Sequence, residues 1–275
     1  MGSLDWLSLL LRSENAIQRE EFIPSLHIPN PGFSRPLLDT PHLRMLSSLV
    51  TSLLARRRLA TVILLTLLPW PAVWLGMYRL DSLLWTFALY HGVCLLPAVI
   101  WGYPLWRQDL RPPTPRQWIW LLGGLVVIVP LSLLVYQDLG KSLLDAPSVL
   151  SVVTRRGFRA AWLLPLILYF VPVNAVLEEL FWRGTVLNEL RGTGGTVGAV
   201  GTLWTALTFA GWHYLVIRLL VRPGWAELTV LGILAAGIFF DWLYRRTSSI
   251  IVPILWHGIV FDLSLLLIFR AVLRG

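Results

Sequence analysis

Apolar stretches long enough to cross a lipid bilayer dominate this 275-residue chain. A helix needs about 20 consecutive apolar residues to span the hydrocarbon, and its backbone groups must be hydrogen-bonded within the segment. These constraints predict an all-α, polytopic membrane helix bundle with seven spans. An eighth is present if the short apolar stretch 143–153 also spans, rather than forming a re-entrant or interfacial helix. The seven spans are predicted at 59–78, 83–105, 118–136, 160–181, 197–220, 227–244 and 249–269.

The composition also indicates a membrane protein. Hydrophobic residues make up 56% of the chain and charged residues 14%, against roughly a quarter charged in soluble domains. The net charge of +8 comes from arginines that flank apolar spans, which is typical of membrane proteins and, without any groove-reading motif, argues against nucleic-acid binding. We therefore expect an integral, multi-pass protein. Its arginine- and tryptophan-rich composition is compatible with a bacterial cytoplasmic membrane.

The chain is predicted to have two parts. Residues 1–58 are polar and proline-punctuated, and they include a segment with helical apolar spacing at 42–54, so we expect an extramembrane, interfacial N-terminal extension. Residues 59–275 form the transmembrane helical domain. The single Cys94 excludes an intramolecular disulfide and is expected to be a core residue. Arginine placement favours an inside N-terminus only slightly.

Three charged residues mark the fourth predicted span. Glu178, Glu179 and Arg183 are each costly in hydrocarbon, by ~2.5–3.5 kcal/mol on insertion scales. Glu179 and Arg183 have the four-residue spacing of a helical ion pair, whereas Glu178 lies about 100° around the helix. We therefore expect Glu179 to be structural and Glu178 to be free to exchange a proton with water. The simpler alternative is that all three cap the helix at the interface.

Two histidines in later spans make a catalytic site the better interpretation. His213 and His257 both lie in the middle of apolar segments, and small residues such as Gly258 adjoin them. Pro172 and Pro253 precede the acidic pair and the second histidine, and they should free backbone carbonyls and kink the helices. A lone intramembrane histidine is more often a packing residue. Two histidines together with an acid pair favour a polar, hydrolytic site.

These motifs resemble those of the CPBP family, the CAAX-protease and bacteriocin-processing intramembrane peptidases. The resemblance covers about 160–269, which we take as the catalytic core, and leaves the first three spans without a motif. The residues that carry it are Glu178-Glu179 with Arg183, Phe209 with His213, and His257. The segment 237–250 also resembles the family's penultimate helix.

The resemblance implies glutamate-type proteolysis without a metal or other cofactor. Glu178 would act as the general base on water, assisted by His213. Glu179 and Arg183 would form a structural pair, with Phe209 as a supporting residue. His257 would stabilise the tetrahedral oxyanion.

One position departs from the family pattern. The third motif usually carries Asn, or sometimes Asp, four residues after its histidine, where this chain has Phe261. The nearest polar residue, Asp262, should lie about 140° around an α-helix from His257, so we expect it not to reach the oxyanion. Three explanations stay open at this stage: Asp262 is protonated, it orients His257, or the oxyanion hole is completed elsewhere.

Three other classes compete with this reading. Glu and His side chains could form a zinc site, although no His-Glu-x-x-His spacing is present. The chain could be a non-catalytic scaffold or immunity protein of the same family. A proton-coupled transporter is disfavoured because paired broken helices are absent. The expected partners are the lipid bilayer and a protein or peptide substrate, whose identity, like the oligomeric state, the sequence leaves open.

Overall fold

The computed structural model describes residues 53, 56–191 and 198–274. Within this part the chain is helical, and its only bridge of β type is an isolated one between Leu144 and Val221. The predicted N-terminal extension therefore lies outside the described residues, apart from 53 and 56–58. Six helices in the described part are long and apolar enough to cross a membrane, namely Arg56–Arg79, Leu83–Trp101, Pro115–Gly140, Ala160–Arg191, Ala226–Thr247 and Ile251–Arg274.

The predicted number of seven or eight spans is not confirmed. The helix α12 (Ala199–Leu220) matches the expected fifth span in position and length, but it is not among the six helices that are sufficiently apolar. Its polar residues, including His213 and Arg218, account for this. The stretch 143–153 falls at the end of α7 (Pro115–Leu143) and in α8 (Ala146–Arg155). Because α8 has ten residues, it is too short to span a bilayer.

Several long helices in the described part combine α and π segments, whereas α7 (Pro115–Leu143), α12 and α13 (Ala226–Thr247) are α-helical throughout. The capping box of Thr114 and Gln117 starts α7, and Ser248, with a left-handed backbone, follows α13 (Ala226–Thr247). The remaining elements are α3 (Pro69–Trp74), η1 (Leu75–Arg79), α4 (Leu83–Phe87), η2 (Ala88–Leu95), α5 (Leu96–Trp101), α6 (Tyr103–Trp106), η3 (Arg107–Asp109), η4 (Ala160–Trp162), α9 (Leu163–Tyr169), η5 (Phe170–Asn174), α10 (Ala175–Glu179), η6 (Leu180–Leu187), α11 (Asn188–Arg191), α14 (Ile251–Leu255), η7 (Trp256–Asp262) and α15 (Leu263–Arg274).

Five of these segments, η1, η2, η5, η6 and η7, are π-helical. A π-helix uses i→i+5 hydrogen bonds, is rare, and often marks a functional site. Pro172 lies within η5, and Pro253 lies in α14 just before η7, so missing proline N–H groups accompany both changes of helical register. π-Helical segments thus occur at or near both prolines, and they change which side chains share a face.

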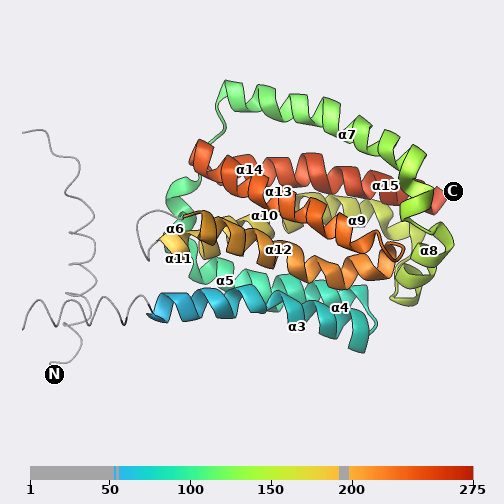
Figure 1. Cartoon of the computed structure of the whole chain (residues 1–275), viewed down its shortest axis with the longest axis horizontal. Helices are drawn as coiled ribbons and strands as arrows, with labels where there is room; N and C mark the ends of the chain where they lie inside the picture. Colours follow the sequence, from blue (N-terminus) through green and yellow to red (C-terminus); the bar gives the residue numbers. More distant parts are fainter. Residues whose placement is uncertain (1–52, 54–55, 192–197, 275) are drawn as a thin grey trace, which may run out of the picture. The chain divides into compact units, whose positions relative to one another are not determined.

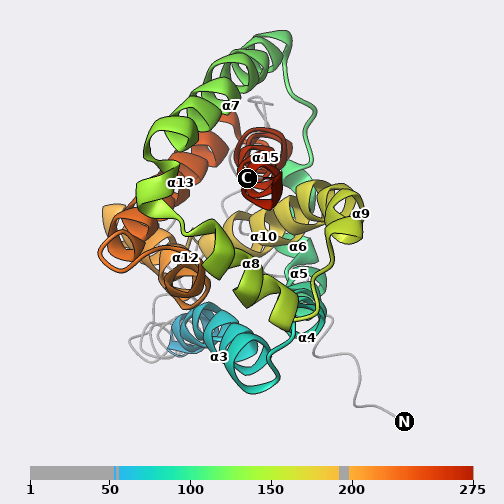
Figure 2. The ribbon, with the colours of Figure 1, turned by 90° about the vertical axis from the view of Figure 1, so that its right-hand side faces the viewer.

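The helix α10 lies in the interior of the bundle. Figure 2 views the bundle end-on and shows α10 surrounded by other helices, and its neighbours include η2, η7 and α14. By contrast, α7 lies along the outside against α15 and η7 (Figure 1). Large apolar side chains are exposed on outer surfaces, among them Val126 and Leu164. Such surfaces suit contact with lipid, as expected for an integral multi-pass protein.

Two glycines permit close helix contacts around the interior. A Cβ on Gly258 would collide with the backbone carbonyl of Val171 and would lie 3.2 Å from the Cβ of Ala175. A Cβ on Gly237 would come within 3.1 Å of the Phe209 ring. Small residues thus let η7 approach η5 and let α13 approach α12.

Candidate active site

Glu179, Arg183 and Asp241 form a buried ionic cluster. The Arg183 guanidinium donates to Glu179 Oε1 at 3.2 Å and to Asp241 Oδ1 at 2.8 Å. It also donates to the carbonyl of Gly237 at 2.7 Å. All three charged residues are 0% exposed. The predicted four-residue ion pair is therefore present, but it is deep in the bundle and not an interfacial cap, because the helix continues to Arg191.

Asp241 was missed by the sequence analysis. It accepts a hydrogen bond from Thr205 at 2.9 Å in addition to the one from Arg183. One sequence signal for it is a carboxylate inside an apolar span, which needs a buried cation as partner. The rings of Phe209 and Phe240 lie 4.9 Å and 5.3 Å from the guanidinium carbon of Arg183. Phe209 thus supports the cluster by a cation–π contact.

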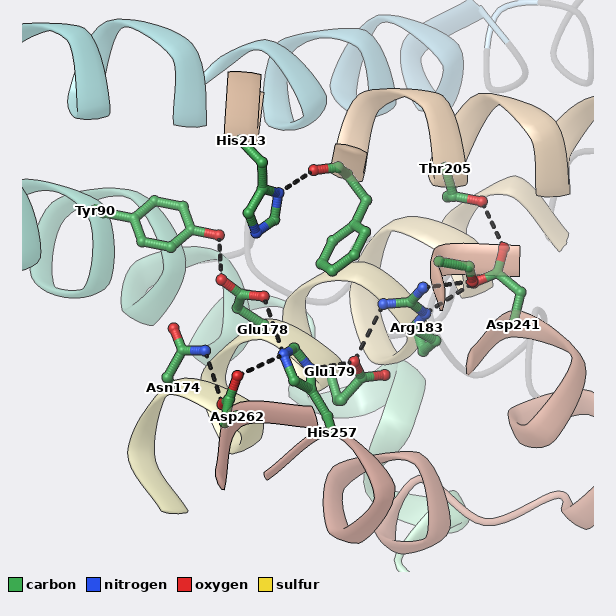
Figure 3. A network of polar contacts seen from close by, with 12 residues as sticks. Tyr90, Asn174, Glu178, Glu179, Arg183, Thr205, His213, Asp241, His257 and Asp262 are labelled. Carbon is green, nitrogen blue, oxygen red and sulfur yellow. Dashed lines mark hydrogen bonds and ion pairs between the residues drawn. The ribbon is translucent and has the colours of Figure 1, made fainter. Parts of the chain in front are cut away.

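Glu178 faces away from Arg183, as its position around the helix predicted. Its Oε1 accepts a hydrogen bond of 2.9 Å from the hydroxyl of Tyr90, a residue that the sequence analysis did not single out. Its Oε2 is buried without a hydrogen-bond partner and lies 3.7 Å from His257 Nε2. The side chain of Glu178 is therefore hydrogen-bonded at one oxygen, and its other oxygen has only the longer ion-pair contact with His257 (Figure 3).

His213 is held in one tautomer by its own helix. Its Nδ1 lies 2.7 Å from the carbonyl oxygen of Phe209. Since a carbonyl can only accept, Nδ1 carries the proton, and Nε2 of a neutral ring keeps its lone pair. The ring stacks on Trp212 at 3.7 Å and points toward the side chains of Tyr90 and Glu178 (Figure 3). Unlike Glu178, His213 is partly exposed.

His257 lies among three carboxyl groups. Its Nδ1 is 2.8 Å from Glu179 Oε1 and so donates to that carboxylate. Its Nε2 lies 3.7 Å from Glu178 Oε2 and 3.5 Å from Asp262 Oδ1. The ring stacks on Phe240 with centroids 5.0 Å apart. Glu179 therefore has a second contact beside its ion pair, because the same oxygen binds both Arg183 and His257.

The expected position of Asp262 was wrong. The prediction assumed α-helical geometry after His257, but residues Trp256–Asp262 form the π-helix η7. With i→i+5 hydrogen bonding, residues five apart return to the same face, and Asp262 lies beside His257 (Figure 3). Its other oxygen accepts a hydrogen bond of 3.2 Å from the Asn174 amide. The π-helix thus compensates for the one-residue offset from the family's spacing.

The three predicted catalytic candidates come from three different helices. Glu178 and His257 are 1% and 5% exposed, and Phe209 lies against both histidine rings at centroid distances of 4.9 Å and 6.2 Å. In the part of the chain that the structure describes, no group of three or more His, Cys, Asp or Glu side chains has an arrangement that could hold a metal ion. Cys94 is buried and forms no disulfide.

Comparison with protein families gives one match. Residues 160–261 match the family model described as type II CAAX prenyl endopeptidase Rce1-like. The matched region contains the acid pair, Arg183 and both histidines, and it ends one residue before Asp262. No curated protein and no solved structure matches the chain. Residues 160–261 are therefore similar to the Rce1-like CAAX proteases, which agrees with the resemblance that the motifs indicated.

Proposed function

We propose that this protein is a glutamate-type intramembrane endopeptidase that hydrolyses a peptide bond of a membrane-associated protein or peptide. The supporting observation is the state of Glu178. Its buried carboxyl group has one oxygen held by Tyr90 and the other without a hydrogen-bond partner. A carboxylate in this state can accept a proton from water and return it.

In the proposed reaction, water lies between Glu178 and His213 Nε2. Glu178 takes one proton from the water as the water oxygen attacks the carbonyl carbon of the substrate. His213 accepts a hydrogen bond from the same water through its free lone pair, which the Phe209 carbonyl keeps available. When the tetrahedral intermediate breaks, Glu178 gives its proton to the departing amine, and the C–N bond is replaced by a carboxyl group and an amine.

His257 is the proposed donor to the oxyanion. Its Nδ1 donates to Glu179, so a second proton on Nε2 would be available to a substrate oxygen. Asp262 and Glu178 flank Nε2 and favour the protonated ring. Asp262 acts as a charge partner in this scheme, because an ionised carboxylate has no proton to donate. Of the explanations left open by the sequence, this arrangement supports orientation of His257 by Asp262.

The buried ionic cluster would keep this geometry fixed. Glu179 holds the His257 ring through Nδ1 and is itself held by Arg183. Asp241 and the Gly237 carbonyl complete the coordination of the guanidinium. These groups would position the reacting residues without touching the substrate, which is a common use of outer hydrogen-bond partners.

The substrate class is inferred from the family description. It names CAAX prenyl endopeptidases, which makes a prenylated C-terminal peptide the first candidate. Proteins with C-terminal sorting tags and peptide precursors are the other candidates. The arginine- and tryptophan-rich composition is compatible with a bacterial cytoplasmic membrane as the location.

Cleavage by purified protein in proteoliposomes tests the proposal. Prenylated and unprenylated peptides of the same sequence would be incubated with wild type, with Glu178→Gln and with Glu227→Gln, and products identified by mass spectrometry. Glu227 is an exposed glutamate hydrogen-bonded to Tyr214, and it serves as the matched control. We expect cleavage by wild type and the control but not by Glu178→Gln. Cleavage by Glu178→Gln at the wild-type rate would contradict the proposed base.

A further inference from the structure

We infer that Tyr90, on a helix outside the family-matched region, is a positioning residue that sets the orientation of the Glu178 carboxylate. This inference rests on the proposed function. The helix Leu83–Trp101 carries no motif of the family, and the match begins only at residue 160. The site would then be incomplete without a contribution from the second span.

The contact is specific and deeply buried. The Tyr90 hydroxyl donates to Glu178 Oε1 at 2.9 Å, and the two residues are 3% and 1% exposed. The terminal torsion of a glutamate is broad and roughly two-fold, so a carboxylate without a donor can rotate. A single donor at Oε1 selects which oxygen faces His257, and it leaves Oε2 without a hydrogen bond, 3.7 Å from His257 Nε2. Tyr90 thereby presents the oxygen that the reaction would use.

Tyr90 is itself held firmly by its neighbours. Its ring packs against Trp212 with centroids 4.5 Å apart and against His91 at 5.2 Å. Both Tyr90 and His91 lie in the π-helix η2. Trp212 also stacks on His213 at 3.7 Å, so one aromatic group positions the hydroxyl of Tyr90 and the imidazole of His213 relative to each other.

The adjacent His91 ties the same helix to the helix of Glu178. Asn174 Oδ1 can only accept, so His91 Nε2, at 3.0 Å, carries the proton, and the neutral ring accepts at Nδ1 from the hydroxyl of Tyr169 at 2.7 Å. Asn174 precedes Glu178 by one helical turn and donates to Asp262. Its amide is a poor proton relay, which favours a positioning role for this chain of contacts over a proton path.

A hydroxyl that merely joins two helices would affect folding and not the chemistry. A positioning hydroxyl should affect kcat and its pH dependence. Tyr78, on the preceding long helix Arg56–Arg79, supplies a control. Its hydroxyl donates to the carbonyl of Leu215 in α12 at 2.6 Å. Tyr90→Phe removes a buried phenol hydrogen bond between helices and Tyr78→Phe a partly buried one, but only Tyr90→Phe removes a contact to Glu178.

The test compares kcat, KM, the pH–rate profile and melting temperature of wild type, Tyr90→Phe, Tyr78→Phe and Glu178→Gln in the same lipid. We expect Tyr90→Phe to lose about 10- to 100-fold in kcat, the scale of a misplaced catalytic group, with KM nearly unchanged. The acidic limb of its profile should move to higher pH, because ionised Glu178 loses a donor. Tyr78→Phe should keep the wild-type kcat and profile.

A wild-type kcat and profile for Tyr90→Phe, with Glu178→Gln inactive, would overturn the inference and leave the proposed function standing. Turnover by Glu178→Gln would instead overturn the proposed function. If Tyr90→Phe does not fold, fluorotyrosine at position 90 keeps the ring and the hydroxyl while making the phenol a stronger donor. It should move the acidic limb to lower pH, and an unchanged profile would count against the inference.

Discussion

Removing the Asp241 carboxylate should destabilise the protein strongly. Arg183 is fully buried, and its contact with Asp241 at 2.8 Å is the shorter of its two ionic contacts. In Asp241→Ala, one of the two carboxylates that neutralise the buried guanidinium is lost. Breaking a buried ion pair by removing one partner costs about 3–5 kcal/mol. We expect a loss of this size in the free energy of unfolding.

The variant Asp241→Asn removes the negative charge of this side chain while nearly preserving its size and shape. The amide keeps an acceptor for Arg183 and a group near Thr205. Hydrogen bonds to charged groups contribute roughly 1.5–3 kcal/mol, and neutral ones roughly 0.5–1.5 kcal/mol. The free energy of unfolding of Asp241→Asn should therefore lie between the values of wild type and Asp241→Ala.

The assay is reversible unfolding in mixed micelles by titration with a denaturing detergent. Asp145→Ala is the control, because its contact with Arg222 at 3.4 Å is exposed, and exposed pairs contribute little. We expect no measurable change for that variant. If Asp241→Ala unfolded with the wild-type free energy, the buried cluster would not be the structural core that we describe.

Three further predictions concern the site. His257→Ala should lower turnover on the order of 100-fold, the scale of one lost oxyanion donor. Asp262→Asn should lower turnover less, because the amide preserves the contact with Asn174. Equal losses in both variants would contradict these roles. Activity should survive EDTA and phenanthroline; loss on chelation with recovery on adding zinc would instead support the zinc alternative. Gly258→Val should impair folding, since the Val171 carbonyl leaves no room for a side chain; a wild-type melting temperature would show that η5 and η7 can separate.

The sequence predicted the interactions that depend on one helix. The spacing of Glu179 and Arg183 is sufficient to predict their ion pair, and it also predicts that Glu178 points elsewhere. The apolar runs likewise located six of the long helices. Both kinds of inference depend only on helical geometry and local hydrophobicity.

Contacts between distant helices could not be predicted in the same way. Tyr90 gave no signal, because a tyrosine in an apolar span is common and its partner is 88 positions away. Asp241 did give a signal, as an acid within a span, but its pairing with Arg183 depends on how α13 packs. Asp262 was misplaced because the sequence was read with 100° per residue, and nothing in that pattern reveals the π-helix η7. A change from α-helical to π-helical geometry therefore moves a side chain to a different face of the helix from the one that the sequence predicts.

The central claim is that Glu178 acts on water while Glu179 maintains structure. The most direct measurement is turnover and unfolding of Glu178→Gln and Glu179→Gln side by side, with Glu227→Gln as control. We predict that Glu178→Gln keeps its melting temperature and loses cleavage, whereas Glu179→Gln is destabilised because Arg183 and His257 lose their shared partner. A stable but inactive Glu179→Gln together with an active Glu178→Gln would exchange the two roles and contradict this account.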